Sequence, residues 1–89
     1  MRFTWDPKKA EANSRKHRVS FEEASTVFDD PFAVVHPDDV HPERELIVGT
    51  SKRSRLLLCV YVEFQEDEIR IISARRLTKK ENTDYEEDP

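Results

Sequence analysis

The chemistry that this chain can perform is most visible in the cations near its C-terminal end. Arg70, Arg75 and Arg76 belong to a run in which apolar and basic residues alternate, and Lys79 and Lys80 follow closely. A guanidinium group offers a planar pair of donors that matches the oxygens of a phosphate. The cluster therefore indicates phosphate binding on a strand. The alternative is a solvated sheet face whose arginines form surface ion pairs, which contribute little to stability.

Acid–base chemistry would need a further group, and His17 is the best candidate because imidazole titrates near neutrality. Cleaving RNA through its own 2′-hydroxyl requires a base, an acid for the leaving oxygen and positive charge on the phosphate. Lys16 adjoins His17, and Arg75 or Arg76 would stabilise the phosphate. Neighbouring strand residues point to opposite faces, so we expect only one arginine in the site. We favour Arg75, although it shares a face with Arg70 only if the strand twists or carries a bulge.

Each of these candidates has a structural alternative. A histidine in the last turn of a helix also interacts favourably with the helix dipole. Tyr85 could stack on a base or donate to a phosphate, but ordinary packing of the last helix is the stronger reading. Trp5 is a stacking platform or a packing anchor, and the sequence favours packing. The remaining candidate substrate contacts are cations on or next to predicted strands or the last helix: Arg44, Arg55, Arg70 and Lys79.

Two features that suggest other chemistry are better explained as structure. The segment 36–41 holds two histidines and two aspartates, which are metal-ligand types, but Pro37 and Pro42 stiffen it and no ordered spacing is present. A solvated acidic loop is the better interpretation, and we expect neither a metal nor another cofactor. Cys59 lies within an apolar run, where burial raises a thiol pKa, so it is expected to be a core residue. The lone cysteine and the lack of an apolar N-terminal segment favour the cytoplasm.

Charge is segregated along the chain. The 89 residues carry a net charge of −4 and are expected to form one domain over residues 1–89. Residues 1–20 and 46–80 are each basic, whereas residues 21–45 and 81–89 are acidic. This distribution argues against a general nucleic-acid coat and permits a local basic cleft. The longest apolar run is too short to span a membrane.

Prolines and helix-capping residues in the sequence predict the helices and strands that position these side chains. Asp6-Pro7 begins a helix, and Ser20 with Glu23 and Thr78 with Glu81 are capping boxes. Short connections favour an antiparallel meander, so the predicted class is α+β: an antiparallel sheet with two N-terminal helices and one C-terminal helix. We predict strands over 2–5, 32–36, 45–50, 55–64 and 69–75, helices over 7–17, about 21–29 and about 79–87, and a frayed acidic tail over 86–89.

Five motifs follow one another along the chain: Phe3-Thr4-Trp5-Asp6, Lys16 to Ala24, Val27 to Pro31, Arg70 to Arg76 and Thr78 to Tyr85. In this order they resemble the BrnT family of bacterial toxins, and the resemblance covers essentially the whole chain. The closing helix of that family usually carries a Glu and a Tyr spaced as Glu81 and Tyr85 are. One departure is Arg18, where the family usually has glycine; a positive φ there would strain arginine by roughly 1 kcal/mol.

The resemblance implies a RelE-like fold and a metal-independent endoribonuclease that inhibits translation. It also implies a cognate BrnA-type antitoxin, a ribbon-helix-helix protein, through which alone the pair would reach its DNA operator. No membrane is implied. The alternative is a non-catalytic interaction module that binds an antitoxin and acts as a co-repressor, and Arg18 keeps it open because it would redirect Lys16 and His17.

Overall fold

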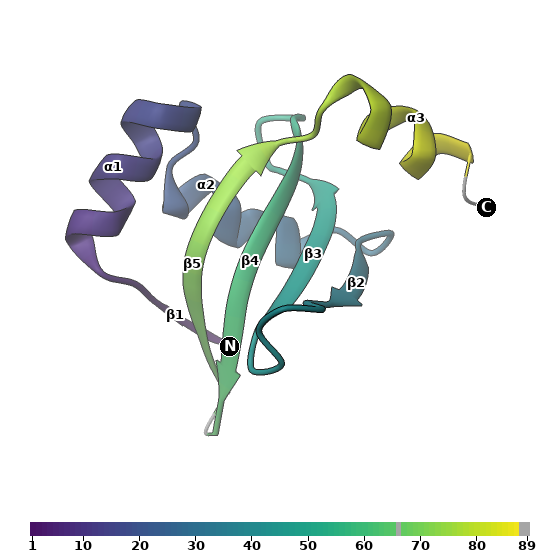
Figure 1. Ribbon diagram of the computed structural model, residues 1–89. Coiled ribbons are helices and arrows are strands. Elements are labelled where there is room, and N and C mark those ends of the chain that lie inside the picture. Colours follow the sequence, from purple (N-terminus) through teal and green to yellow (C-terminus); the bar gives the residue numbers. More distant parts are fainter. Residues whose placement is uncertain (66, 88–89) are drawn as a thin grey trace.

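Five strands form one sheet in the order β1-β5-β4-β3-β2 (Figure 1). The computed structural model describes residues 1–65 and 67–87. Strands β2 to β5 pair antiparallel with their chain neighbours, so the predicted α+β class and its meander are confirmed. The elements are β1 (Arg2–Thr4), α1 (Pro7–His17), α2 (Phe21–Ser25), the 3₁₀ helix η1 (Thr26–Asp29), β2 (Val34–Pro37), β3 (Glu45–Thr50), β4 (Leu56–Phe64), β5 (Glu68–Arg76) and α3 (Lys79–Glu87).

The pairing of β1 departs from the predicted antiparallel sheet. β1 lies parallel to β5, with Arg2 opposite Glu68 and Thr4 opposite Arg70, so the sheet is mixed. No hairpin joins these two strands, and a tight turn is what forces antiparallel pairing. Because β1 pairs only with the first part of β5, no strand of the described residues lies beside the outer edge of β5 beyond Arg70.

Local signals determine the first helix. The Asp6 side chain accepts a hydrogen bond from the Lys8 N–H at 2.9 Å, and Pro7 occupies the first turn, where its missing N–H costs nothing. The helix ends at His17 because Arg18 adopts the left-handed conformation, with φ 59° and ψ 33°. Its N–H donates to the Ser14 carbonyl at 2.9 Å. The predicted bounds are confirmed, and the positive φ that would strain an arginine occurs.

The two predicted capping boxes have different outcomes. At α3 the box is complete: the Thr78 N–H donates to Glu81 at 2.8 Å, and the Glu81 N–H donates to the Thr78 hydroxyl at 3.2 Å. At α2 only half forms. The Ser20 hydroxyl accepts from the Glu23 N–H at 3.0 Å, but the Glu23 carboxylate turns inward to Arg55 instead of back to Ser20. The predicted second helix also divides into α2 and η1.

One face of the sheet is covered by α1, α2 and η1, and the core lies between them. Gly49 on β3 allows close packing here, since a Cβ at this position would lie 2.9 Å from the Ala33 Cβ. Cys59 is fully buried, and burial raises its pKa to about 12, which confirms it as a core residue. The core consists of Val19, Phe21, Ala24, Val27, Ile47, Leu57, Cys59, Tyr61, Ile69, Ile71 and Ala74.

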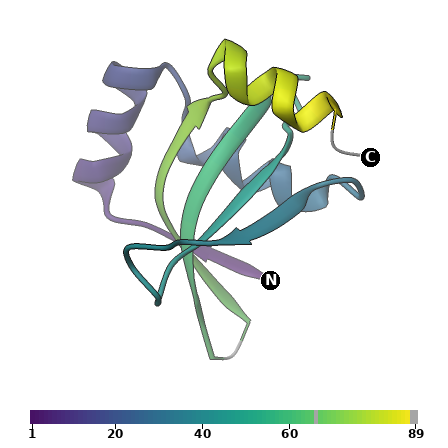
Figure 2. The ribbon, with the colours of Figure 1, turned by 45° about the vertical axis from the view of Figure 1, so that its right-hand side comes forward.

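The last helix does not join that layer. α3 lies across the end of the sheet, beyond the end of β5, as two views agree (Figures 1 and 2). It runs through Glu87, and the rest of the predicted acidic tail falls outside the described residues. No helix in residues 1–65 and 67–87 has the length and apolar character needed to cross a membrane.

Candidate functional site

The sheet topology gathers cations at one end of the molecule. The end of α1, the turn between β3 and β4, the end of β5 and the start of α3 all lie at that end (Figure 1). The Arg55 guanidinium donates to the Arg18 carbonyl at 2.9 Å, and Arg76 is the cross-strand partner of Leu57. Acidic side chains surround the β2–β3 and β4–β5 connections at the opposite end, and others, such as Glu81 and Asp30, lie close to the cationic end itself. The cationic end carries Lys16, Arg18, Lys52, Arg53, Arg55, Arg75, Arg76, Lys79 and Lys80.

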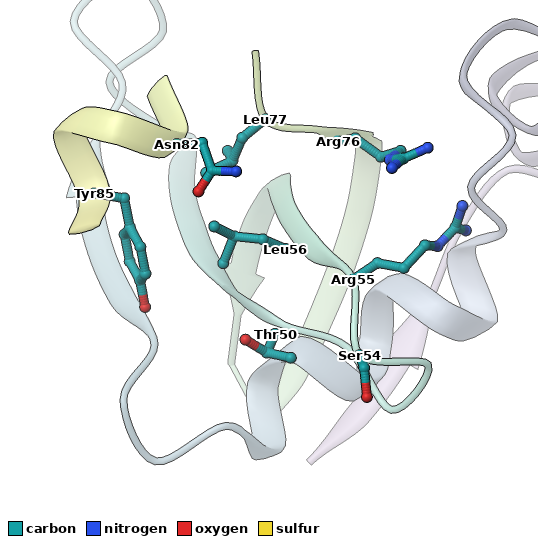
Figure 3. A pocket seen from close by; sticks show the side chains of 8 residues that line it. All are labelled: Thr50, Ser54, Arg55, Leu56, Arg76, Leu77, Asn82 and Tyr85. Carbon is teal, nitrogen blue, oxygen red and sulfur yellow. The ribbon is translucent and has the colours of Figure 1, made fainter. Parts of the chain in front are cut away.

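An open pocket of about 470 Å³ lies at this end. Arg55 and Arg76 extend their guanidinium groups toward the same side of it, whereas Asn82 and Tyr85 from α3 stand on the other side (Figure 3). Two leucines lie between them. The pocket thus offers cationic donors on one wall, an apolar middle, and an amide and a phenol on the opposite wall. Its lining is Thr50, Ser54, Arg55, Leu56, Arg76, Leu77, Asn82 and Tyr85.

A buried carboxylate holds Arg55 in position. The Glu23 side chain is only 4% exposed and accepts from the Arg55 Nε at 2.9 Å and from its Nη2. The Ser51 hydroxyl donates to the same carboxylate at 2.7 Å. These hydrogen bonds, that from Arg55 above all, hold the pKa of Glu23 below its usual value. A charge at this depth is tolerated only when it is paired and hydrogen-bonded, so Arg55 is fixed rather than free.

Arg75 is also engaged, by the helix that follows it. Its Nη1 and Nη2 donate to the two oxygens of Glu81 at 2.7 and 2.9 Å, a bidentate pair. The guanidinium, together with the Thr78 N–H, lowers the pKa of the Glu81 carboxyl to about 2. This pair ties α3 to β5. Arg76, by contrast, is exposed and forms no ion pair with any residue in the described part of the chain.

A β-bulge decides which way these arginines face. Val60 pairs with Ser73 but Tyr61 pairs with Ile71, so Ile72 is an extra residue in β5. Cross-strand partners share a face, and Arg75 therefore lies on the same open face as Arg70. Arg76 lies with Leu57 on the face that the N-terminal helices cover. The bulge that the Arg70–Arg75 prediction required is present.

Asn13 is a polar residue that our sequence interpretation missed. Its side chain is 7% exposed and substitutes for a strand along the free edge of β5. The amide donates to the Ala74 carbonyl at 2.8 Å and accepts from the Ala74 N–H at 3.1 Å. It also donates to the Val19 carbonyl at 3.0 Å. A polar residue one turn before the end of a weakly amphipathic helix gives no signal of this role.

The other predicted site residues are spread more widely. His17 is half-buried and Lys16 exposed in the last turn of α1, which Arg55 reaches through the Arg18 carbonyl. Tyr85 lines the pocket, and its hydroxyl donates to the Phe32 carbonyl at 3.3 Å. Lys79 opens α3.

Three predicted contacts are not brought to the pocket. Arg44 precedes β3 near the acidic end, where its Nε lies 3.9 Å from a Glu43 oxygen. Arg70 lies toward the other end of β5. Trp5 packs edge-on against Phe21 with ring centroids 5.9 Å apart, which fits its packing alternative.

The acidic loop after β2 is organised by a turn. The Asp38 carboxylate accepts from the N–H groups of Val40 and His41 at 2.8 and 3.0 Å, and these two bonds lower the pKa of Asp38. Within residues 1–65 and 67–87, no three His, Cys, Asp or Glu side chains gather as metal ligands would.

Comparison with known proteins decides the family. The family profile described as "Ribonuclease toxin, BrnT, of type II toxin-antitoxin system" matches residues 5–81. The chain belongs to the BrnT family. The 1.1 Å crystal structure of the Brucella abortus ribonuclease toxin BrnT has the same fold, with a TM-score of 0.73 and 20% sequence identity over 89% of this chain and 99% of that one. Comparison with curated proteins gives no significant match.

Membership of the BrnT family gives the pocket a chemical context. The chain is a ribonuclease toxin of a type II toxin–antitoxin system, with RNA as its substrate and an antitoxin as its partner. The polyanionic substrate is complementary to the cationic end of the molecule, whose charge is opposite to the net charge of the whole chain.

Proposed function

We propose that this BrnT-family protein is a metal-independent endoribonuclease of the cytoplasm that cleaves RNA at its cationic end and so inhibits translation. A cognate BrnA-type, ribbon-helix-helix antitoxin neutralises it, and DNA is reached only through that antitoxin. The observation that carries the proposal is the pocket that Arg55, Arg76 and Tyr85 line together.

The ion-pair partners of the three arginines near the pocket indicate their roles. Arg55 is held by Glu23 and Arg75 by Glu81, so both are partly neutralised in the free protein. Arg76 has no such partner among the described residues and is exposed at the pocket wall. We therefore assign the scissile phosphate to Arg76, with Arg55 as a fixed second cation. We therefore propose Arg76 in place of Arg75, which the sequence analysis favoured, because the Arg75 guanidinium is paired with Glu81.

The remaining groups suit cleavage by the 2′-hydroxyl of the substrate. A base removes the hydroxyl proton, the oxygen attacks phosphorus, and the 5′ oxygen leaves with a proton from an acid, giving a 2′,3′-cyclic phosphate. His17 and Lys16 supply the proton-transfer groups, because Arg55 ties the end of α1 to the pocket through the Arg18 carbonyl. Tyr85 stacks on a base or donates to phosphate, and Asn82 lies beside it.

The test measures cleavage of a defined RNA by purified protein in excess EDTA, with end-group analysis of the products. We expect cyclic phosphate or 3′-phosphate ends, and a loss on the order of 10²-fold for Arg76→Ala, as for one preorganised charge-stabilising donor. Arg76→Lys should restore activity only in part, because an ammonium lacks the planar fork. Arg2→Ala, at the far end of the sheet, is the matched control. Activity that required a divalent ion, or an Arg76→Ala protein with the wild-type rate, would contradict the proposal.

A further inference from the structure

Exposed apolar side chains gather at one edge of this protein. Large hydrophobic residues with high exposure in the described chain number six, and four of them lie between residues 32 and 40. They are Phe32 at 79%, Val34 at 37%, Val35 at 49% and Val40 at 78%. Scattered exposed residues are ordinary, but such a grouping on a small protein marks a surface that another molecule covers.

The same residues lie on or next to β2, the last strand of the sheet. Among residues 1–65 and 67–87, β2 pairs only with β3, so its other side is a free edge in this part of the chain. The Asp38 N–H donates to the Arg44 carbonyl at 3.3 Å, and hydrogen-bonded pairs alternate along an antiparallel ladder. The N–H and C=O of Val35 therefore point away from β3. Pro37 has no N–H, which keeps the open part of the edge short.

The charge around the edge restricts what can bind it. Residues 29–45 carry six acidic side chains and one basic side chain. A second copy of the chain would bring two such acidic surfaces together, and like charges in an interface are unfavourable. An extended segment with apolar and basic residues would instead be complementary in both respects.

We propose that the free edge of β2 binds an extended, apolar and basic segment of the antitoxin, which adds as a sixth strand. The inference depends on the proposed function only in taking the antitoxin as the partner. Main-chain bonds to Val35 would supply pairing, and the two exposed valines would supply side-chain contacts on both faces. The edge also begins beside the pocket, because the Phe32 carbonyl accepts from the Tyr85 hydroxyl. A strand bound here reaches α3 and the rim of the cationic end without occupying the pocket.

The first test uses the double variant Val34→Lys/Val35→Lys and the antitoxin encoded beside the toxin gene. Isothermal titration calorimetry should show binding weakened at least 10-fold, whereas Phe64→Lys, an exposed apolar residue at the far end of β4, should bind like the wild type. RNA cleavage by the free double variant should be unchanged, because neither valine belongs to the pocket. Equal affinity of the double variant and the wild type would overturn the inference.

Amide exchange in the ¹⁵N-labelled toxin gives an independent readout. The Val35 N–H should become protected when the antitoxin binds, since it then donates to the added strand. A complex that inhibits cleavage but leaves Val35 exchanging as in the free toxin would disprove strand addition alone. A wild-type protein that neither cleaves RNA nor binds the antitoxin would instead disprove the proposed function.

Discussion

Replacing Asn13 with alanine tests how the strand that carries the arginines is held. Beyond Arg70 no strand in the described part of the chain adjoins the outer edge of β5, and the Asn13 amide pairs with both backbone groups of Ala74. Its third hydrogen bond fixes the Val19 carbonyl, just after the left-handed turn that ends α1. Alanine keeps the helix but removes all three bonds.

The expected loss of stability in Asn13→Ala follows from the number of hydrogen bonds removed. Each hydrogen bond contributes about 1 kcal/mol, and a buried backbone group left without a partner costs about 1–3 kcal/mol. The better helix propensity of alanine returns about 0.5 kcal/mol. We therefore expect the free energy of unfolding to fall by about 3 kcal/mol, a large part of the 5–15 kcal/mol typical of a domain. With a urea slope of about 1.5 kcal/mol per M, the midpoint would fall by about 2 M.

Urea denaturation followed by far-UV circular dichroism measures this change, with Ser14→Ala as the exposed neighbouring control. Asn13→Asp separates packing from hydrogen bonding, since it keeps the shape and one acceptor but loses both donors and places a charge against two carbonyl oxygens. It should be less stable than Asn13→Ala. If Asn13→Ala stays within about 0.5 kcal/mol of the wild type, comparable to a surface substitution, the edge-pairing argument is wrong.

Two further stability predictions concern the ends of helices. Arg18→Gly should raise the free energy of unfolding by about 1 kcal/mol, because glycine adopts the φ of 59° without strain; an unchanged urea midpoint would contradict this. The Arg75–Glu81 pair should make stability depend on pH. The folded pKa of Glu81, about 2, lies below its unfolded value near 4.5, so the pair stabilises fully above about pH 4.5 and loses its effect as the pH falls toward 2. The difference in urea midpoint between wild type and Glu81→Gln should therefore shrink over that range, and a constant difference from pH 7 to 3 would exclude the pair as its source.

Features that depend on neighbouring residues were predictable from the sequence. Asp6-Pro7 predicted the start of α1, and Thr78 with Glu81 predicted the start of α3. Each of these helix-start signals depends only on side chains and backbone groups within one helical turn. The prediction was wrong for the Glu23 half of a capping box, because the carboxylate pairs with Arg55, 32 residues away. A local motif cannot reveal a distant competitor for the same side chain.

In the candidate site, too, the directions and ion-pair partners of the arginines depend on residues that are distant in the sequence. Simple alternation placed Arg70 and Arg76 on one face and Arg75 on the other, and the extra residue Ile72 reverses that assignment. The bulge depends on how β5 aligns with β4, which the sequence of β5 alone does not contain. Likewise, the sequence identified the cations but could not show that Glu23 and Glu81 hold two of them.

The net charge of −4 is a sum over local surfaces of opposite charge. RNA binding requires a positive field only where the phosphate lies, and the fold brings nine of the basic residues to that end. The acidic residues of segment 38–45 lie around the β2–β3 connection at the opposite end, whereas Asp29 and Asp30 lie beside Thr50 and Lys52. The two proposals together assign the polyanionic substrate to the cationic end and a basic antitoxin strand to the β2 edge. Both proposals therefore predict salt dependence, since RNA and antitoxin should each bind more weakly as salt rises, while the variants of each surface should affect only their own ligand.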